Sequence, residues 1–171
     1  RSSLSSSSAA SDVYKRQNLH PAIASVDVSS GGVLALYGGD DYISNTRNWA
    51  RTARPAASTF KTYAAVAGMR HGFSLRSRLD GNAFTPDGGK TEVRNENDKS
   101  YGTVSLRQAI AKSINTAFVD MVSRTKNGPK AVVQAATDAG VPRGTGWDLN
   151  NRIALGLSLI HISEPTRPLY I

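Results

Sequence analysis

The stretch that most constrains the fold is STFKTYAAVAG, which occupies residues 58–68. Its apolar residues, with Pro55 just upstream and a glycine at the end, predict a helix over residues 58–68. Ser58 and Lys61 stand three positions apart, so one helical face would carry both side chains, one turn apart. Backbone N–H groups at a helix N-terminus lack partners and can bind a developing oxyanion. The segment therefore contains the parts that acyl transfer requires.

A serine becomes a good nucleophile only when a neighbouring base takes its proton. Lysine can be this base if its amine is neutral, and burial or nearby positive charge favours the neutral form by lowering the pKa. The two histidines between residues 18 and 156, His20 and His71, have no triad-like setting. An isolated Ser-x-x-Lys pair is most often a helix-capping serine followed by a solvated lysine. The pair therefore needs support from the rest of the sequence.

Two short apolar runs upstream predict a β-hairpin. Residues 22–28 and 33–37 are rich in β-branched and apolar side chains, and the glycine-bearing turn SSGG separates them. The sequence GGDD at residues 38–41 should end the second strand. Residues 40–57 are then expected to form a polar connection, in which Trp49 is the best candidate for burial.

The downstream part predicts helices after a long irregular segment. Residues 70–102 are rich in Gly, Asn, Asp and Lys, and their periodicity is weak. Strands that come first and helices that follow favour an α+β fold, with an antiparallel sheet packed with helices. The helices are expected at residues 103–112, with Val104, Leu106 and Ile110 on one face, at 117–123, and from Pro129 to Gly140.

Composition limits the possible functions. The 171 residues suffice for one domain with a core, and 39% hydrophobic with 20% charged residues is typical of a globular protein. The absence of cysteine excludes disulfides, thiolate metal sites and a cysteine nucleophile, and we expect neither a cofactor nor a metal. The formal charge of +8 comes from scattered basic residues without interleaved aromatics, which argues against nucleic acid as a partner. No apolar run approaches the roughly 20 residues that span a bilayer, so we expect any membrane anchor outside this chain.

A second polar pair supports the first and reveals a resemblance. Ser113 and Asn115 follow Ser58 at a distance of 55 and 57 residues. Ser-x-x-Lys followed by Ser-x-Asn resembles the penicillin-binding transpeptidases and their serine β-lactamase relatives. The wider match is to the class A, bifunctional penicillin-binding proteins and covers residues 18–156. It includes LALYGG (34–39), NWA (48–50) through Arg54, GTVSLRQA (102–109), SINTAFV (113–119) and IALG (153–156).

This resemblance implies the penicillin-binding transpeptidase and serine β-lactamase fold, together with a mechanism. Ser58 would attack the carbonyl of a D-alanyl-D-alanine stem peptide of peptidoglycan, and Lys61 would take its proton. Ser113 would relay a proton to the leaving amine, while Asn115 would hydrogen-bond the substrate amide and orient Lys61. An amine on a neighbouring strand would then accept the acyl group and complete the crosslink. β-Lactams would acylate the same serine.

The sequence departs from the family pattern in three places. Family members commonly have glycine before the nucleophile and often proline after the lysine, whereas this chain has Ala57 and Thr62. In addition, no Lys-Thr-Gly triplet or variant follows Asn115. The strand that would bind the substrate carboxylate is then missing, and the fold would be incomplete at the C-terminus. We therefore expect little or no activity from this chain alone.

The two ends of the chain suggest the domain limits. Residues 1–17 contain seven serines without periodicity and resemble translated adapter sequence or a disordered tail. Residues 157–171 also resemble adapter sequence. We expect a partial transpeptidase domain at residues 18–156, with a glycosyltransferase domain and a membrane anchor upstream in the whole protein. Its location would be the extracytoplasmic face of the bacterial cell membrane.

Other functions stay open on the same residues. A β-lactamase or a penicillin-sensing domain could use this scaffold, and in a non-catalytic wall-binding module Ser58 and Lys61 would be merely structural. A class A β-lactamase needs a deacylating glutamate after Ser-x-Asn, and residues 97–156 contain no glutamate. A sensor would need a signalling domain elsewhere in the gene.

Overall fold

The computed structural model describes residues 20–39, 46–52, 55–86, 91–141 and 147–157. The chain divides into two compact units, an N-terminal unit (Arg1–Thr52) and a C-terminal unit (Ala53–Ile171). The expected adapter-like ends lie outside the described residues, apart from Leu157. No helix in the described ranges is long and apolar enough to cross a membrane.

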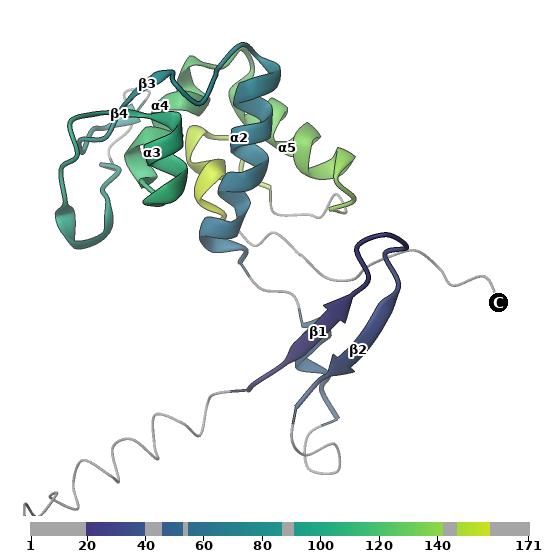
Figure 1. Cartoon of the computed structure of the whole chain (residues 1–171). Coiled ribbons are helices and arrows are strands. Elements are labelled where there is room, and N and C mark those ends of the chain that lie inside the picture. The colour runs from purple at the N-terminus through teal and green to yellow at the C-terminus, as the bar shows by residue number, and fades with distance from the viewer. Residues whose placement is uncertain (1–19, 40–45, 53–54, 87–90, 142–146, 158–171) are drawn as a thin grey trace, which may run out of the picture. The chain divides into compact units, whose positions relative to one another are not determined.

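The N-terminal unit contains the predicted hairpin, which the structure confirms (Figure 1). Strands β1 (Ile23–Val26) and β2 (Val33–Tyr37) are antiparallel, with Ile23 opposite Tyr37 and an irregularity in register after Ser25. The Asp27 carboxylate accepts hydrogen bonds from the backbone N–H groups of Ser29 and Ser30, which shapes the turn. Gly31 takes a positive φ of 71° there, a conformation that favours glycine. Every residue of the two strands is exposed within the described structure.

The expectation of a buried Trp49 is not met. Trp49 begins a short 3₁₀ helix, η1 (Trp49–Arg51), and its ring stacks on that of His20 with the centroids 3.8 Å apart. One face of the indole is thus covered by another surface side chain, which leaves the residue half-buried. None of the described residues between 46 and 57 is fully buried.

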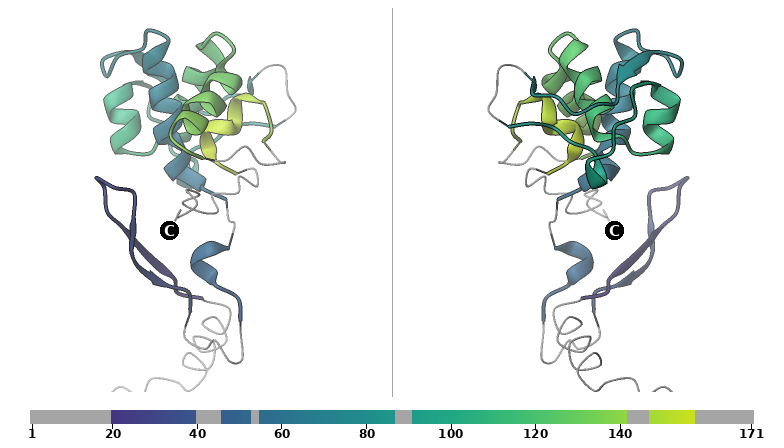
Figure 2. Two further views of the ribbon diagram at one scale, coloured as in Figure 1. Left: turned by 90° about the vertical axis from the view of Figure 1, so that its right-hand side faces the viewer. Right: turned by 90° about the vertical axis from the view of Figure 1, so that its left-hand side faces the viewer.

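The C-terminal unit is built around helix α2 (Lys61–Arg70), which follows the 3₁₀ helix η2 (Ala57–Phe60). Helix α2 packs against α5 (Gly128–Asp138) and against α4 (Asn115–Arg124) (Figure 1). The short helix α3 (Leu106–Ala111) precedes α4, and the 3₁₀ helix η5 (Asn151–Leu155) packs on α4 and α5 (Figure 2). A further 3₁₀ turn, η4, spans Glu96–Asp98.

A second antiparallel pair corrects the prediction of a helix over residues 103–112. Residues Thr103–Ser105 form strand β4, which pairs with β3 (Arg78–Asp80), and Val104 lies opposite the buried Leu79. Helix α3 begins only after Ser105, whose hydroxyl and the Gln108 side chain form a capping box. The predicted apolar face is correspondingly wrong at Ile110, which is 44% exposed. The two-stranded antiparallel sheets and the helices together confirm an α+β fold.

Gly68 does not end its helix as predicted: the glycine with a positive φ is Gly72 (93°), which follows the C-cap residue His71. Helix α2 continues to Arg70, and Gly68 faces Met121 of α4. A Cβ atom on Gly68 would lie 2.6 Å from the Met121 sulfur, so a larger residue would force the buried Met121 side chain to move. By contrast, Pro129 lies in the first turn of α5 and Gly140 follows its end with a φ of 90°, as predicted.

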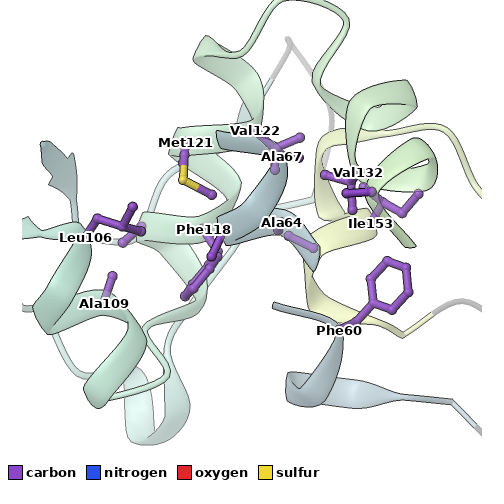
Figure 3. Close-up of a cluster of buried hydrophobic side chains, with 14 of the residues drawn as sticks. Phe60, Ala64, Ala67, Leu106, Ala109, Phe118, Met121, Val122, Val132 and Ile153 are labelled. Atoms are coloured by element: carbon purple, nitrogen blue, oxygen red, sulfur yellow. The ribbon is translucent and has the colours of Figure 1, made fainter. Parts of the chain in front are cut away.

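The core of the C-terminal unit joins these helices in one apolar cluster (Figure 3). Phe60 and Phe118 are its largest fully buried side chains. Ala64 and Ala67 of α2 leave room for the bulkier residues of α4 and α5. Further buried members are Leu79, Leu106, Ala109, Ile114, Met121, Val122, Val132 and Ile153. Because Phe60 and Ile114 directly precede Lys61 and Asn115, the core fixes the backbone on which two predicted site residues stand.

Candidate active site

Ser58 lies in η2, where a backbone hydrogen bond of Ala57 and the buried ring of Phe60 fix the chain on either side of it. The Ala57 N–H donates to the Gly156 carbonyl oxygen at 3.1 Å, and Phe60 is fully buried. Ala57 takes a φ of 47°, the left-handed region that favours glycine. The glycine that the resemblance leads us to expect at this position would adopt this φ without strain. Ser58 itself is exposed, and in the described part of the chain its backbone N–H has no hydrogen-bond partner.

Lys61 brings the four predicted site residues together. Its Nζ lies 3.2 Å from Ser58 Oγ, 2.9 Å from Ser113 Oγ and 2.6 Å from Asn115 Oδ1. The Ser113 carbonyl oxygen accepts a further hydrogen bond from Nζ at 2.7 Å. The side chain reaches these partners from within the fold, since Lys61 is only 4% exposed. Ser113 and Asn115 follow Lys61 by 52 and 54 positions in the sequence, and both contact its amine.

The four contacts around Nζ limit how its protons can be arranged. A carbonyl or amide oxygen can only accept a hydrogen bond, whereas a hydroxyl can accept or donate. In the neutral form the amine has two hydrogens, which the Ser113 carbonyl and Asn115 Oδ1 can take. The amine's lone pair is then directed at a hydroxyl, that of Ser58 or Ser113. The site therefore accommodates the neutral amine that a general base requires.

Burial makes this neutral form accessible. It lowers the pKa of Lys61 from 10.5 to about 8, because removing the ammonium group from water disfavours its charge. Among the described residues, the hydrogen-bond partners of Nζ include no carboxylate, whose negative charge would raise the pKa of Lys61 again. A sizeable fraction of the amine is therefore neutral slightly above physiological pH, as a general base needs.

Ser113 is placed by the tight turn between α3 and α4. Its φ of 52° lies in the left-handed region, which is uncommon for a residue other than glycine. This turn is fastened by two backbone hydrogen bonds, from the Ser113 N–H to the Ile110 carbonyl and from the Ile114 N–H to the Ala109 carbonyl. Both the carbonyl and the hydroxyl of Ser113 consequently reach Lys61. Strained backbone of this kind is frequent at active sites.

Sequence reasoning missed Asn95, which the structure places beside this group. Asn95 is 8% exposed, and its side chain makes four hydrogen bonds that join the segment from Gly81 to Lys99 to the start of α4. It lies within the stretch 70–102, where an asparagine among many polar residues carries no distinguishing pattern. Its hydrogen bonds to Gly81 and Thr116 join residues that are 14 and 21 positions away in the sequence, and no local sequence pattern indicates such contacts.

A cavity of about 410 Å³ opens beside the predicted nucleophile. Glu96 and Lys112 give its wall one negative and one positive side chain. The ammonium groups of Lys99 and Lys112 lie 5.1 and 5.8 Å from the centroid of the Tyr101 ring. No cluster of three metal-ligating His, Cys, Asp or Glu side chains occurs among the residues described. The complete lining is Ser58, Asn95, Glu96, Tyr101, Lys112, Ser113, Ile114 and Asn115.

Known proteins are similar to this chain in sequence. A family model described as the penicillin binding protein transpeptidase domain matches residues 22–154. Penicillin-binding protein 1A of Mycolicibacterium smegmatis is 32% identical in an alignment 151 residues long, which covers 81% of this chain and 19% of that protein. Penicillin-binding protein 1A of Mycobacterium tuberculosis is 31% identical over 81% of this chain. The chain thus spans about a fifth of the length of these curated relatives.

Solved structures agree with the sequence relatives. The structure of the PonA1 protein of Mycobacterium tuberculosis in complex with penicillin V matches with a TM-score of 0.74 and 28% identity, over 91% of this chain and 45% of that one. The crystal structure of penicillin-binding protein 1A from Haemophilus influenzae matches with a TM-score of 0.71 over 83% of this chain and 21% of that one, and at 20% identity it shows the shared fold alone. With a family match over most of its length, this chain belongs to the penicillin-binding protein transpeptidase domain family.

Proposed function

We propose that Ser58 is the nucleophile of a D,D-transpeptidase site that acts on peptidoglycan stem peptides and that β-lactams acylate. One observation carries this proposal: the buried Lys61 amine lies within hydrogen-bond distance of both the Ser58 and the Ser113 hydroxyls. A solvated lysine beside a helix-capping serine would be neither buried nor held by residues 52 positions away. The PonA1 complex with penicillin V, a relative at 28% identity, supports β-lactams as the ligand class.

The proposed acylation begins at Ser58. Its Oγ attacks the carbonyl carbon of the stem peptide while its proton passes to the neutral Lys61 amine. The Ser58 backbone N–H, which has no partner among the described residues, is available to the oxyanion that forms. As the C–N bond breaks, Ser113 Oγ gives its proton to the leaving amine and regains one from the Lys61 ammonium, 2.9 Å away. The products are an acyl ester on Ser58 and free D-alanine, and Lys61 is again neutral.

Deacylation proceeds through the same groups in reverse. An amine from a neighbouring stem peptide attacks the ester carbonyl, and its proton passes through Ser113 to Lys61. Ser58 then leaves with a proton from the Lys61 ammonium, and a new amide bond joins the two strands. Asn115, whose Oδ1 accepts from Lys61 at 2.6 Å, keeps the amine directed at the two hydroxyls throughout.

The whole protein would work at the cell wall. We infer that this domain lies on the outer side of the cytoplasmic membrane, because its proposed substrate is the wall polymer. A membrane anchor and a glycosyltransferase domain upstream would make it the bifunctional, class A type that the sequence resembles. Nothing in the proposed chemistry requires a cofactor or metal.

Labelling with fluorescent penicillin tests the proposal. The chain would be joined to the part of the PonA1 protein that it does not cover, where the family resemblance places the Lys-Thr-Gly strand. We expect covalent label in this hybrid, none in its Ser58→Ala variant, and unchanged label in Ser123→Ala, which removes an exposed serine at the far end of α4. Equal label in Ser58→Ala, or none in a folded hybrid, would contradict the proposal. Label that hydrolyses within minutes would instead favour a β-lactamase.

A further inference from the structure

Asn95 is a buried polar side chain outside the two motifs that resemble known active sites. Its Nδ2 donates to the carbonyl oxygens of Gly81 and Lys99, both at 2.8 Å. Its Oδ1 accepts from the backbone N–H and the hydroxyl of Thr116, both at 3.1 Å. Each hydrogen-bonding group of the amide is therefore used, which is what a polar side chain needs when it is 8% exposed.

These bonds end at the start of α4, next to Asn115. Ile114, the N-cap residue of α4, supplies no side-chain hydrogen bond, so the Thr116 N–H would be an unpaired donor of the first turn. Asn95, which lies outside the helix and 21 residues earlier in the chain, accepts a hydrogen bond from this N–H through its Oδ1. The residue thus caps the helix that carries Asn115 and ties it to the wall of the cavity.

The neighbour of Asn95 completes the arrangement. The Arg94 carbonyl oxygen accepts a hydrogen bond from Asn115 Nδ2 at 3.1 Å. Because a carbonyl can only accept, it selects the amino side of the Asn115 amide and leaves Oδ1 facing Lys61 Nζ at 2.6 Å. If Asn95 released α4, the Arg94 carbonyl and the Asn115 backbone would move independently, and the amide would lose its fixed orientation.

We propose that Asn95 is a positioning residue for acyl transfer: it clamps the segment of Arg94 to the first turn of α4 and so orients the Asn115 amide toward Lys61. The catalytic part of this statement rests on the proposed function, whereas the orientation of Asn115 does not. An aspartate or leucine at position 95 could not do the same, because neither donates to the Gly81 and Lys99 carbonyls while accepting from Thr116.

The experiment compares Asn95→Ala with a matched control in the isotope-labelled chain of all 171 residues. Asn82→Ala is the control, because the hydrogen bonds of the Asn82 side chain go to Gly102 and Asp80 of the same segment, whereas those of Asn95 also reach α4. NMR would follow the Asn115 side-chain amide and the Lys61 ε-methylene. We expect both signals to move in Asn95→Ala and to stay at the wild-type position in Asn82→Ala. Unmoved signals in a folded Asn95→Ala chain would overturn the proposal.

Acylation by penicillin in the hybrid described above adds the functional readout. A misplaced group can cost about 100-fold in rate, so Asn95→Ala should lose up to that factor at a temperature where both variants are fully folded, while Asn82→Ala should remain close to wild type. An equal loss in both variants, or no loss in Asn95→Ala, would show a merely structural role and overturn the proposal. If the wild type is not acylated, the proposed function fails, and the NMR signals still decide the role of Asn95.

A milder variant covers the case in which Asn95→Ala does not fold. Thr116→Val removes one of the two bonds to Asn95 Oδ1 at nearly constant volume and leaves the backbone bond in place. We expect the Asn115 and Lys61 signals to shift from their wild-type positions, because the hydrogen bonding between Asn95 and α4 is partly lost. Unchanged signals would refute the proposal.

Discussion

At the scale of single residues, the proposed chemistry depends on a lysine that the fold keeps away from water. Lys61 is fully surrounded by acceptors and hydroxyls, yet none of these partners is an anion. Its lowered pKa of about 8 therefore follows from burial. Because the base must be neutral, this value sets the pH range in which Ser58 can be activated.

The acylation rate should accordingly depend on pH. The neutral fraction of Lys61 increases as the pH rises through about 8, so the rate constant for penicillin acylation should increase roughly tenfold per pH unit well below this value and level off above it. Acylation rate constants of the hybrid measured between pH 6 and pH 10 would show this increase and the plateau above it. A rate that is constant or falls across pH 6 to 8 would contradict the assignment of Lys61 as base.

The strain at Ala57 predicts opposite effects for two neighbouring alanines. Ala57 has a φ of 47°, which costs an L-residue roughly 1–2 kcal/mol. Ala57→Gly should therefore raise the free energy of unfolding by a few tenths to about 1 kcal/mol, after the entropy cost of glycine. Ala56 has an ordinary helical φ of −69°, so Ala56→Gly should lower the free energy of unfolding by about 0.5–1 kcal/mol. Urea unfolding of both variants tests this, and a loss in Ala57→Gly would contradict it.

At the scale of elements, local signals predicted what local interactions form. The hairpin turn at Asp27–Gly32 and the start of α5 at Pro129 depend on neighbours in sequence, and both were predicted. Strand β4 was missed because Thr103–Ser105 is only three residues long and its partner Leu79 is 25 positions earlier. For the same reason Ser58 and Lys61 could be found as a pair, whereas Asn95 could not.

The contact between α2 and α4 predicts a specific packing defect. Gly68→Ala should lower the free energy of unfolding by about 1–3 kcal/mol, because its Cβ would meet the Met121 sulfur at 2.6 Å and the core is already filled. In a double-mutant cycle with Met121→Ala, the loss from Gly68→Ala should largely disappear. A loss that is the same with either residue at position 121 would show that the clash is not the cause.

At the scale of the whole molecule, the core and the proposed site both belong to the C-terminal unit. All members of the main apolar cluster lie between Ala56 and Ala154. Lys61 and the three residues that contact its Nζ lie in the same part of the chain. The hairpin of the N-terminal unit instead exposes its apolar side chains, among them Leu34 at 71% and Ile23 at 66%. Exposed apolar strands of this kind favour self-association.

Removing residues 1–52 should therefore change solubility more than the fold. We expect a chain of residues 53–171 to keep a cooperative thermal transition, because no core residue is lost, and to remain monomeric at higher concentration than the whole chain. Circular dichroism and analytical ultracentrifugation measure the two properties. A shortened chain without cooperative unfolding would show that the hairpin contributes to the core, and unchanged self-association would show that the exposed strands do not cause it.

The most direct test of the central claim is peptide mapping of the penicillin adduct by mass spectrometry. After the hybrid has reacted with penicillin at pH 8.5, the mass of one penicillin should appear on the peptide that contains Ser58, and fragmentation should place it on Ser58 rather than on Thr59. The Lys61→Met variant should carry little or no adduct. An adduct on another residue, or full occupancy of Ser58 without Lys61, would contradict the account.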